Sequence, residues 1–307
     1  MQHKKSGIFS VIKNINYIAA MFRRSLLVLV TGITFLHAKA QLYESNIHQG
    51  EVGVAVGLGH YFGDLNTRAA INRPKFSAGA FFVKQFNPYV GIKLGADYAF
   101  LAYSDQYSKN AVQKTRNLSF NTNVWEASLS GYFNFFRFIP GTEGFSYTPY
   151  VSLGVGVFSY DPFAYLNGEK YFLRPLGTEG QGSSLYPDRK PYSSMAVCFP
   201  LTVGVKYAIN SDLNVFGEIG YRFTNTDYLD DVSTTYAGPE AFPAIPQPDG
   251  SLAPSPAYLL QDRSYEYGTP IGIKGRQRGI STQKDAYVML HIGVSLNLSS
   301  YKCPQPN

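Results

Sequence analysis

Histidine and cysteine are scarce in this sequence, and their scarcity argues against metal and redox sites. The 307 residues include only five His, two Cys and one Trp. The spacings CxxC and HxxxH, which typify redox and metal sites, do not occur, and no Gly-rich phosphate loop leads into a helix. We therefore expect no metal, no cofactor, no small-molecule substrate and no catalytic residue.

An excess of basic charge is also missing once the first 40 residues are set aside. The chain has 27 Lys and Arg against 21 Asp and Glu, but six of the basic residues and none of the acidic ones lie in 1–40. The remainder therefore carries equal numbers of both signs. A nucleic-acid-binding surface needs clustered basic residues, so we expect no nucleic-acid partner.

Residues 1–40 are predicted to be a leader that carries a cleaved signal peptide. Arg23 and Arg24 precede the apolar run 25–36, and small residues follow it at the expected cut. An uncleaved anchor is the alternative, but a membrane-spanning helix needs about 20 apolar residues and this run is shorter. The exported domain is predicted to be 41–307.

Long apolar runs are absent outside this leader, whereas aromatic residues and glycine are abundant. The chain has 24 Tyr, 22 Phe and 29 Gly, which suits an all-β protein, either a sandwich or a membrane barrel. Eight segments alternate between apolar and small or polar residues. They are 51–59, 75–86, 89–100, 125–136, 150–158, 197–207, 213–223 and 287–298.

The alternation favours a barrel over a sandwich. In 287–298 one parity is uniformly aliphatic, while the other is mostly small and neutral, as in a narrow lumen. Segments of about 9–12 residues match tilted strands that cross a bilayer. The sequence therefore predicts an eight-stranded antiparallel transmembrane β-barrel of the OmpA-like type in the cell outer membrane. Only in 75–86 do aromatics on both parities leave the two faces unassigned.

The gaps between these segments predict the orientation of the barrel. Gaps 60–74, 101–118, 159–195 and 224–285 are long and fall on one side, whereas 87–88, 137–147 and 208–212 are shorter. Outer-membrane barrels have long external loops and short periplasmic turns. The Pro-rich stretch 238–256 is predicted to lack regular structure.

The inward parity of the predicted strands carries charges of both signs. This lumen set is Glu51, Lys93, Asp97, Glu126, Lys206, Glu218 and Arg222. An eight-stranded barrel is just wide enough for side chains to fill it, so these charges are predicted to pair and plug it. A catalytic carboxylate pair is the weaker alternative. His291 is expected to be hydrogen-bonded in the lumen rather than to belong to a catalytic triad.

The acidic stretch "TDYLDDVSTTY" (226–236) is predicted to belong to an external cap. It lacks the glycine that completes a calcium loop, so an ion site is the less favoured hypothesis. The acids are expected to cap a turn or to pair with arginines of the same loop. The cap set is Asp227, Asp230, Asp231, Arg276 and Arg278, with Arg263 as a further candidate.

The two cysteines fall at opposite ends of the predicted barrel. Cys198 lies near the outer end, whereas Cys303 follows the last strand on the periplasmic side. A barrel is about 25 Å tall, far beyond the reach of a disulfide, so no internal bridge is expected. Tyr301, Lys302 and Cys303 are predicted to contact a partner protein, with Cys303 forming a bond to it. An unbonded terminal thiol is the alternative.

Five stretches resemble the PorG-like outer-membrane proteins of Bacteroidota, a DUF6089-type family. They are "HYFGDLN" (60–66), "DPFAYLNGEKYFLRPLGTEGQG" (161–182), "FTNTDYLDDVSTTY" (223–236), "GRQRG" (275–279) and "YKCP" (301–304). The resemblance implies a non-enzymatic subunit of the type IX protein secretion system. Such a subunit would anchor or assemble a periplasmic ring of PorK- and PorN-like proteins, a system linked to motility in gliding species. A surface-binding barrel or an enzyme acting through its external loops is the alternative.

Overall fold

The structure is a computed structural model that describes residues 48–268 and 270–299. The predicted leader 1–40 lies outside these ranges, and so do the tail residues Tyr301, Lys302 and Cys303. The signal peptide and the partner contact of the tail remain predictions. Among the residues that the structure describes, no helix has the length and apolarity needed to cross a membrane.

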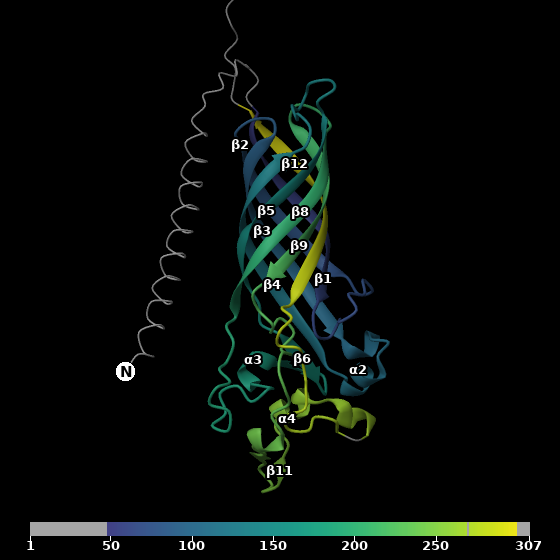
Figure 1. The fold of residues 1–307 in the computed structure, drawn as a ribbon, viewed down its shortest axis with the longest axis vertical. Coiled ribbons are helices and arrows are strands. Elements are labelled where there is room, and N and C mark those ends of the chain that lie inside the picture. Colours follow the sequence, from purple (N-terminus) through teal and green to yellow (C-terminus); the bar gives the residue numbers. More distant parts are fainter. Residues whose placement is uncertain (1–47, 269, 300–307) are drawn as a thin grey trace, which may run out of the picture. The chain divides into compact units, whose positions relative to one another are not determined.

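Eight long antiparallel strands form a closed barrel (Figure 1). They are β1 (His48–Phe62), β2 (Lys75–Gln85), β3 (Val90–Ser104), β4 (Ser119–Asn134), β5 (Tyr147–Ser159), β8 (Met195–Ala208), β9 (Leu213–Thr224) and β12 (Ala286–Ser299). Each strand pairs with the next along the chain, and β12 pairs with β1 to close the sheet. The predicted fold class is confirmed, and each observed strand contains or overlaps its predicted segment.

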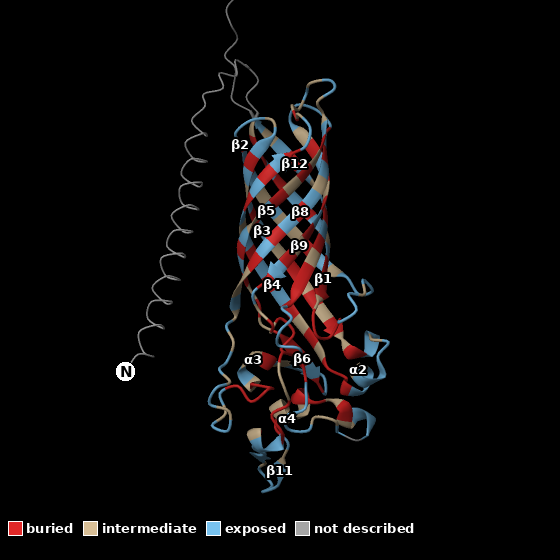
Figure 2. Ribbon diagram, in the orientation of Figure 1, coloured by how far each residue is buried: buried red, intermediate tan, exposed pale blue. Residues whose placement is uncertain are grey.

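The two faces of the barrel wall differ in the way that the sequence alternation predicts. Apolar side chains point outward along every strand, so that Val54 is 58% and Ile292 is 69% exposed, while inward neighbours are buried (Figure 2). In β2, Phe76 and Phe82 point outward whereas the inward Phe81 is partly buried. This placement explains why the faces of that strand could not be assigned. An outward apolar belt is what a transmembrane barrel presents to lipid.

Four long loops gather at one end of the barrel, opposite the short turns (Figure 1). We call them the cap: loop A (63–74), loop B (105–118), loop C (160–194) and loop D (225–285). Loop B contains η1 (Asp105–Tyr107) and α2 (Ala111–Arg116), and loop C contains β6 (Phe163–Leu166), β7 (Glu169–Phe172) and α3 (Leu173–Leu176). Loop D contains η2 (Pro239–Ala241), β10 (Ile245–Pro246), β11 (Leu252–Ala253), α4 (Pro256–Gln261) and η3 (Ser264–Tyr267).

The Pro-rich stretch 238–256 contains regular structure, contrary to the prediction from the sequence. It forms η2 and a two-residue ladder in which Ile245 pairs with Ala253. Gly250, with φ of 81°, supplies the left-handed residue that the turn between β10 and β11 needs. A short hairpin tolerates proline because most of its backbone groups face solvent.

The cap shares one apolar core with the mouth of the barrel. The buried cluster that contains Phe120 of β4 also contains Leu65 of loop A, Leu118 of loop B, and Leu229 and Leu260 of loop D. Burying such side chains contributes about 1.5–3 kcal/mol each. The cap is therefore a folded extension of the barrel and not a set of independent loops.

The outward belt can be tested by placing a charge in it. Ile292→Lys in the middle of β12 is expected to destabilise the barrel by about 2–4 kcal/mol, because lysine would face the centre of the bilayer. Urea unfolding of the protein in phospholipid vesicles measures this change. Ile273→Lys, at an isoleucine of the cap that is 65% exposed, is the matched control and should change stability by less than about 0.5 kcal/mol. Equal effects would contradict a lipid-facing β12.

Candidate functional site: the filled lumen and the external cap

The structure brings all seven predicted lumen charges together in ion pairs. Lys93 Nζ lies 2.8 Å from Glu218 Oε2, and Arg222 lies 3.3 Å from Glu126 and 3.6 Å from Asp97. Lys206 pairs with Glu51. A buried charge is tolerated only when it is paired and hydrogen-bonded. Six of these ions meet both conditions, and Asp97, which is paired at 3.6 Å, is only partly buried.

Tyrosine and amide side chains fill the space between these ion pairs. The Tyr150 hydroxyl donates to Glu218 over 2.6 Å, and the Tyr287 hydroxyl donates to Glu126 over 2.7 Å. Asn214 donates to Glu51 over 3.0 Å. At the end with the short turns, the buried ring of Phe138 lies 4.4 Å from the Lys206 ammonium. The lumen is therefore packed with side chains along its length.

His291 lies between a serine and an aspartate, which resembles a catalytic triad. Its Nε2 is 3.0 Å from Ser77 Oγ, and its Nδ1 is 3.8 Å from Asp97 Oδ1. However, Ser77 exposes none of its surface and His291 only 2% of its own. A nucleophile must reach its substrate, so this arrangement links β2, β3 and β12 and offers no acyl-transfer site.

In the cap, the three predicted acids of 226–236 are buried and play different roles. Asp227 accepts a hydrogen bond from the Ser233 hydroxyl, and Asp230 accepts one from the Tyr61 hydroxyl. Asp231 accepts from Tyr192 over 2.7 Å. The stretch folds back on the barrel mouth, so its polar groups are directed inward.

Of the three candidate arginines, only Arg278 pairs with these acids. It lies 3.6 Å from Asp231 and also donates to the Asp231 carbonyl. Arg276 lies in the cap but is exposed and donates to the Ile271 carbonyl over 3.3 Å. Arg263 pairs with Glu266 at 2.7 Å instead. Arg278 is buried and directed into the cap, whereas Arg276, two residues earlier, remains at the surface.

The central acid of the cap is Glu179 of loop C, which is not among the residues predicted from the sequence. Its carboxylate lies 3.1 Å from Arg278 and accepts the backbone N–H of Ser233 over 2.9 Å. It also accepts the N–H of Thr234, so it connects loop C to loop D. In the sequence, Glu179 is distinguished only by its place in the motif 161–182, because no local pattern indicates that loops C and D lie together.

A second ion pair fixes loop B. Arg116 donates through Nε and Nη2 to both carboxylate oxygens of Asp105, at 2.7 Å each. Its remaining donors reach the backbone carbonyls of Asp64 and Arg278. Such a bidentate pair has a fixed geometry, so this guanidinium joins loops A, B and D.

Burial raises the pKa of several acids in the cap. It raises the pKa of Asp64 to about 6 and that of Asp227 to about 7. It raises the pKa of Asp231 to about 6, although Arg278 opposes the shift. The pKa values of Asp230 and Asp285 are raised well above the ordinary range, by burial and then by neighbouring carboxylates. Within the described ranges, no group of His, Cys, Asp and Glu has the geometry of a metal site.

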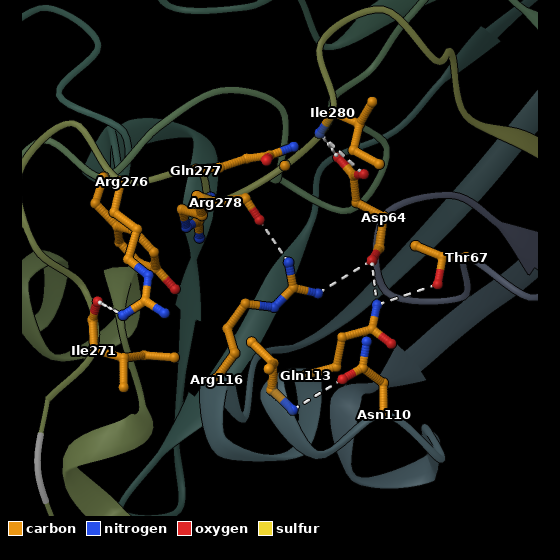
Figure 3. Close-up of a pocket in the computed structure, with 13 residues that line it drawn as sticks. Asp64, Thr67, Asn110, Gln113, Arg116, Ile271, Arg276, Gln277, Arg278 and Ile280 are labelled. Carbon is orange, nitrogen blue, oxygen red and sulfur yellow. Dashed lines mark hydrogen bonds between the residues drawn. The ribbon is translucent and has the colours of Figure 1, made fainter.

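A pocket of about 380 Å³ opens between loops A, B and D (Figure 3). Asp64 and Thr67 come from loop A, Gln113 and Arg116 from α2 and its C-terminal end, and Arg276 from loop D. The pocket is not predictable from the sequence, because its walls come from three separate loops that only the fold brings together.

The sequence profile described as "Domain of unknown function (DUF6089)" matches residues 23–237. No curated protein sequence matches the chain.

Three solved structures are similar at low scores. The chain is 12% identical to Neisserial surface protein A, with 83% of this chain and 100% of that chain covered and a TM-score of 0.38. It is 7% identical to Ail of Yersinia pestis, with 81% and 97% covered and a TM-score of 0.36. It is 11% identical to OprG from Pseudomonas aeruginosa, with 82% and 97% covered and a TM-score of 0.34. The architecture of this chain is established by its own strand pairing.

The raised acid pKa values predict that the cap is more stable in mild acid. A folded-state pKa above the unfolded value of about 3.9 means that the folded cap binds more protons, so stability falls as pH rises from about 4 to 7. Limited proteolysis at pH 5 and pH 8 should show slower cleavage of loop D at pH 5. Asp227→Asn should reduce this difference, whereas Asp249→Asn on the exposed turn of the same loop should not. Faster cleavage at pH 5 in the wild type would contradict the prediction.

Removing Arg278 should open the cap without unfolding the barrel. Arg278→Gln leaves the buried Glu179 and Asp231 without their cation, and breaking a buried ion pair costs about 3–5 kcal/mol. We expect protease to cut loops C and D in this variant while the barrel strands stay protected. Arg276→Gln removes an exposed arginine from the same loop and should cleave like the wild type. Equal protection of both variants would show that Arg278 does not hold the cap.

Proposed function

Since the chain belongs to the DUF6089 family, we propose that it is a non-enzymatic outer-membrane anchor that holds or assembles the periplasmic ring of the type IX secretion system. The observation that carries this proposal is a barrel that is apolar outside and filled inside. Such a body is held by outer-membrane lipids and has no open channel, so it suits binding better than transport. The link to secretion rests on the resemblance to PorG-like proteins.

The outer-membrane location is supported by the wall of the barrel. Outward valine, leucine or isoleucine side chains lie on seven of the eight strands, and β2 presents Phe76 and Phe82 instead. Other aromatic side chains, such as Trp125 and Phe223, are also outward. Closure of the sheet satisfies its backbone N–H and C=O groups without water, which is required of any sheet in lipid. With long loops outside, the short turns face the periplasm.

The short turns form one continuous surface on which a ring protein could bind. The Ala208 N–H donates to the Ser146 carbonyl over 2.7 Å, so the turn after β4 lies against the turn after β8. The Asn297 side chain donates to the Ser211 carbonyl over 3.0 Å, which ties the end of β12 to the same surface. The predicted partner residues Tyr301, Lys302 and Cys303 follow β12 directly in the sequence.

A binding role is also favoured over an enzymatic role. The Ser77 hydroxyl is buried, and the lumen carboxylates are held in ion pairs with Lys93, Lys206 and Arg222. A general acid or base must reach the reacting group within hydrogen-bonding distance, and these groups are enclosed.

Recovery of the ring proteins tests the proposal. Tagged protein extracted from its host membrane is expected to co-purify with PorK- and PorN-like proteins. Replacing 141–144 with four serines should reduce their recovery, because it alters the periplasmic turn. The same replacement at 248–251, on the exposed tip of loop D, is the matched control and should leave recovery unchanged.

Loss of the gene gives a second and independent measurement. Deletion is expected to stop export of cargo that carries the C-terminal secretion signal, and the 141–144 variant should restore export less well than the wild type. Normal export in the deletion strain would reject the proposed function.

A further inference from the structure

Two adjoining pockets lie in the external cap and together form a groove between loops A and B. The first, of about 380 Å³, is the pocket of Figure 3. The second, of about 270 Å³, is lined by residues of loops A and B and the nearby Tyr103 at the end of β3. Both pockets are lined by Thr67 and Gln113, whose side chains are hydrogen-bonded at 3.3 Å. We call the pair the cationic groove.

Exposed cations without acidic partners line this groove. Arg276 lines the first pocket, and Arg68 and Lys109 line the second. Arg73 lies with its guanidinium carbon 4.3 Å from the centre of the Tyr107 ring, which also lines the second pocket. None of these four side chains forms an ion pair within the described part of the chain. Their charge is therefore available to a ligand.

The other charged groups of the groove are already neutralised. Arg116 is held by Asp105, and Arg278 is held by Glu179 and Asp231. Asp64 is the only acid that lines either pocket. Its carboxylate is buried and accepts the Ile280 N–H over 3.0 Å, so it is directed into the cap. The exposed charge of the groove is positive, and a positively lined concavity concentrates anions.

The uncharged lining determines which class of anion fits. Amides of Asn110 and Gln277 and the hydroxyls of Thr67 and Ser108 line the groove. Thr67 accepts from Gln113, Ser108 donates to Gln113 and Asn110 Oδ1 accepts the Val112 N–H, so each keeps part of its hydrogen-bonding capacity. Side chains of this type pair with the hydroxyl groups of a sugar, which both donate and accept. Tyr107 adds an exposed aromatic ring, which can pack against the C–H face of a sugar ring. The combined volume lies within the range of about 300–1,000 Å³ for small-ligand sites.

We propose that the cationic groove binds an anionic saccharide, that is, a short oligosaccharide carrying carboxylate or phosphate groups. Arg68, Lys109 and Arg276 contact the anionic groups, and the amides and Tyr107 contact the sugar. An acidic peptide would satisfy the same cations, so the test includes one as a comparison ligand. This activity lies on the external face and does not depend on the proposed periplasmic function.

Calorimetry on the full chain in detergent micelles tests the assignment. The probe is trigalacturonate, with maltotriose as a neutral saccharide and tetra-aspartate as an acidic peptide. We expect trigalacturonate to bind, to bind more weakly as salt is raised, and to bind better than either comparison ligand. The variants are Arg68→Gln, Lys109→Gln and Arg276→Gln, alone and combined, and Lys274→Gln is the matched control. Lys274 lies on loop D but does not line either pocket.

The triple variant should lose affinity by about tenfold or more, while Lys274→Gln should match the wild type. An unchanged proteolysis pattern will show that the triple variant keeps the folded cap. Maltotriose binding as tight as trigalacturonate, or a triple variant that binds normally, would overturn the proposal. Equal or tighter binding of tetra-aspartate would overturn it in favour of a peptide.

The anionic saccharide could be free in solution or could be the headgroup of a membrane glycolipid. Titration of trigalacturonate into protein in phospholipid vesicles, with and without lipopolysaccharide, distinguishes these sources. Weaker apparent binding in the presence of lipopolysaccharide supports a headgroup ligand, and unchanged binding supports a free saccharide. Failure of binding in every arm rejects the groove as a site and leaves the periplasmic role unaffected.

Discussion

Pairing of β1 with β12 is the constraint from which the rest of the structure follows. It closes the sheet, so that the strands have no free edge and their backbone groups need no water. Closure with eight strands makes the lumen narrow, and the alternation of side chains then places every second residue inside it. Charged residues on that face are buried or mostly buried, and they pair with one another, as Lys93 does with Glu218 and Lys206 with Glu51.

The same requirement organises the cap, where the buried groups come from loops instead of strands. Arg278 lies between Glu179 and Asp231, and Arg116 is held by Asp105 while it donates to the carbonyls of loops A and D. Four of the sequence motifs, 60–66, 161–182, 223–236 and 275–279, supply Asp64, Glu179, Asp231 and Arg278. These four side chains are buried and make contacts within the cap.

The filled lumen lies between two surfaces at opposite ends of the barrel. The cationic groove lies among the long loops, whereas the contiguous turns around Ser146 and Ser211 lie at the opposite end. Ion-paired side chains in the described part of the lumen lie between the two ends.

The sequence by itself determined the eight strands, the inward and outward faces of all of them except 75–86, and the long and short loops. Those properties are local, because alternation with a period of two and the length of each gap are both visible along the chain. The same alternation identified all seven lumen charges. Only the tertiary structure decided that Arg278 and not Arg276 pairs with the acids, that Glu179 lies at the centre of the cap, and that a groove forms between loops A and B. These contacts join residues far apart in the sequence, and loop packing has no period that a sequence can display.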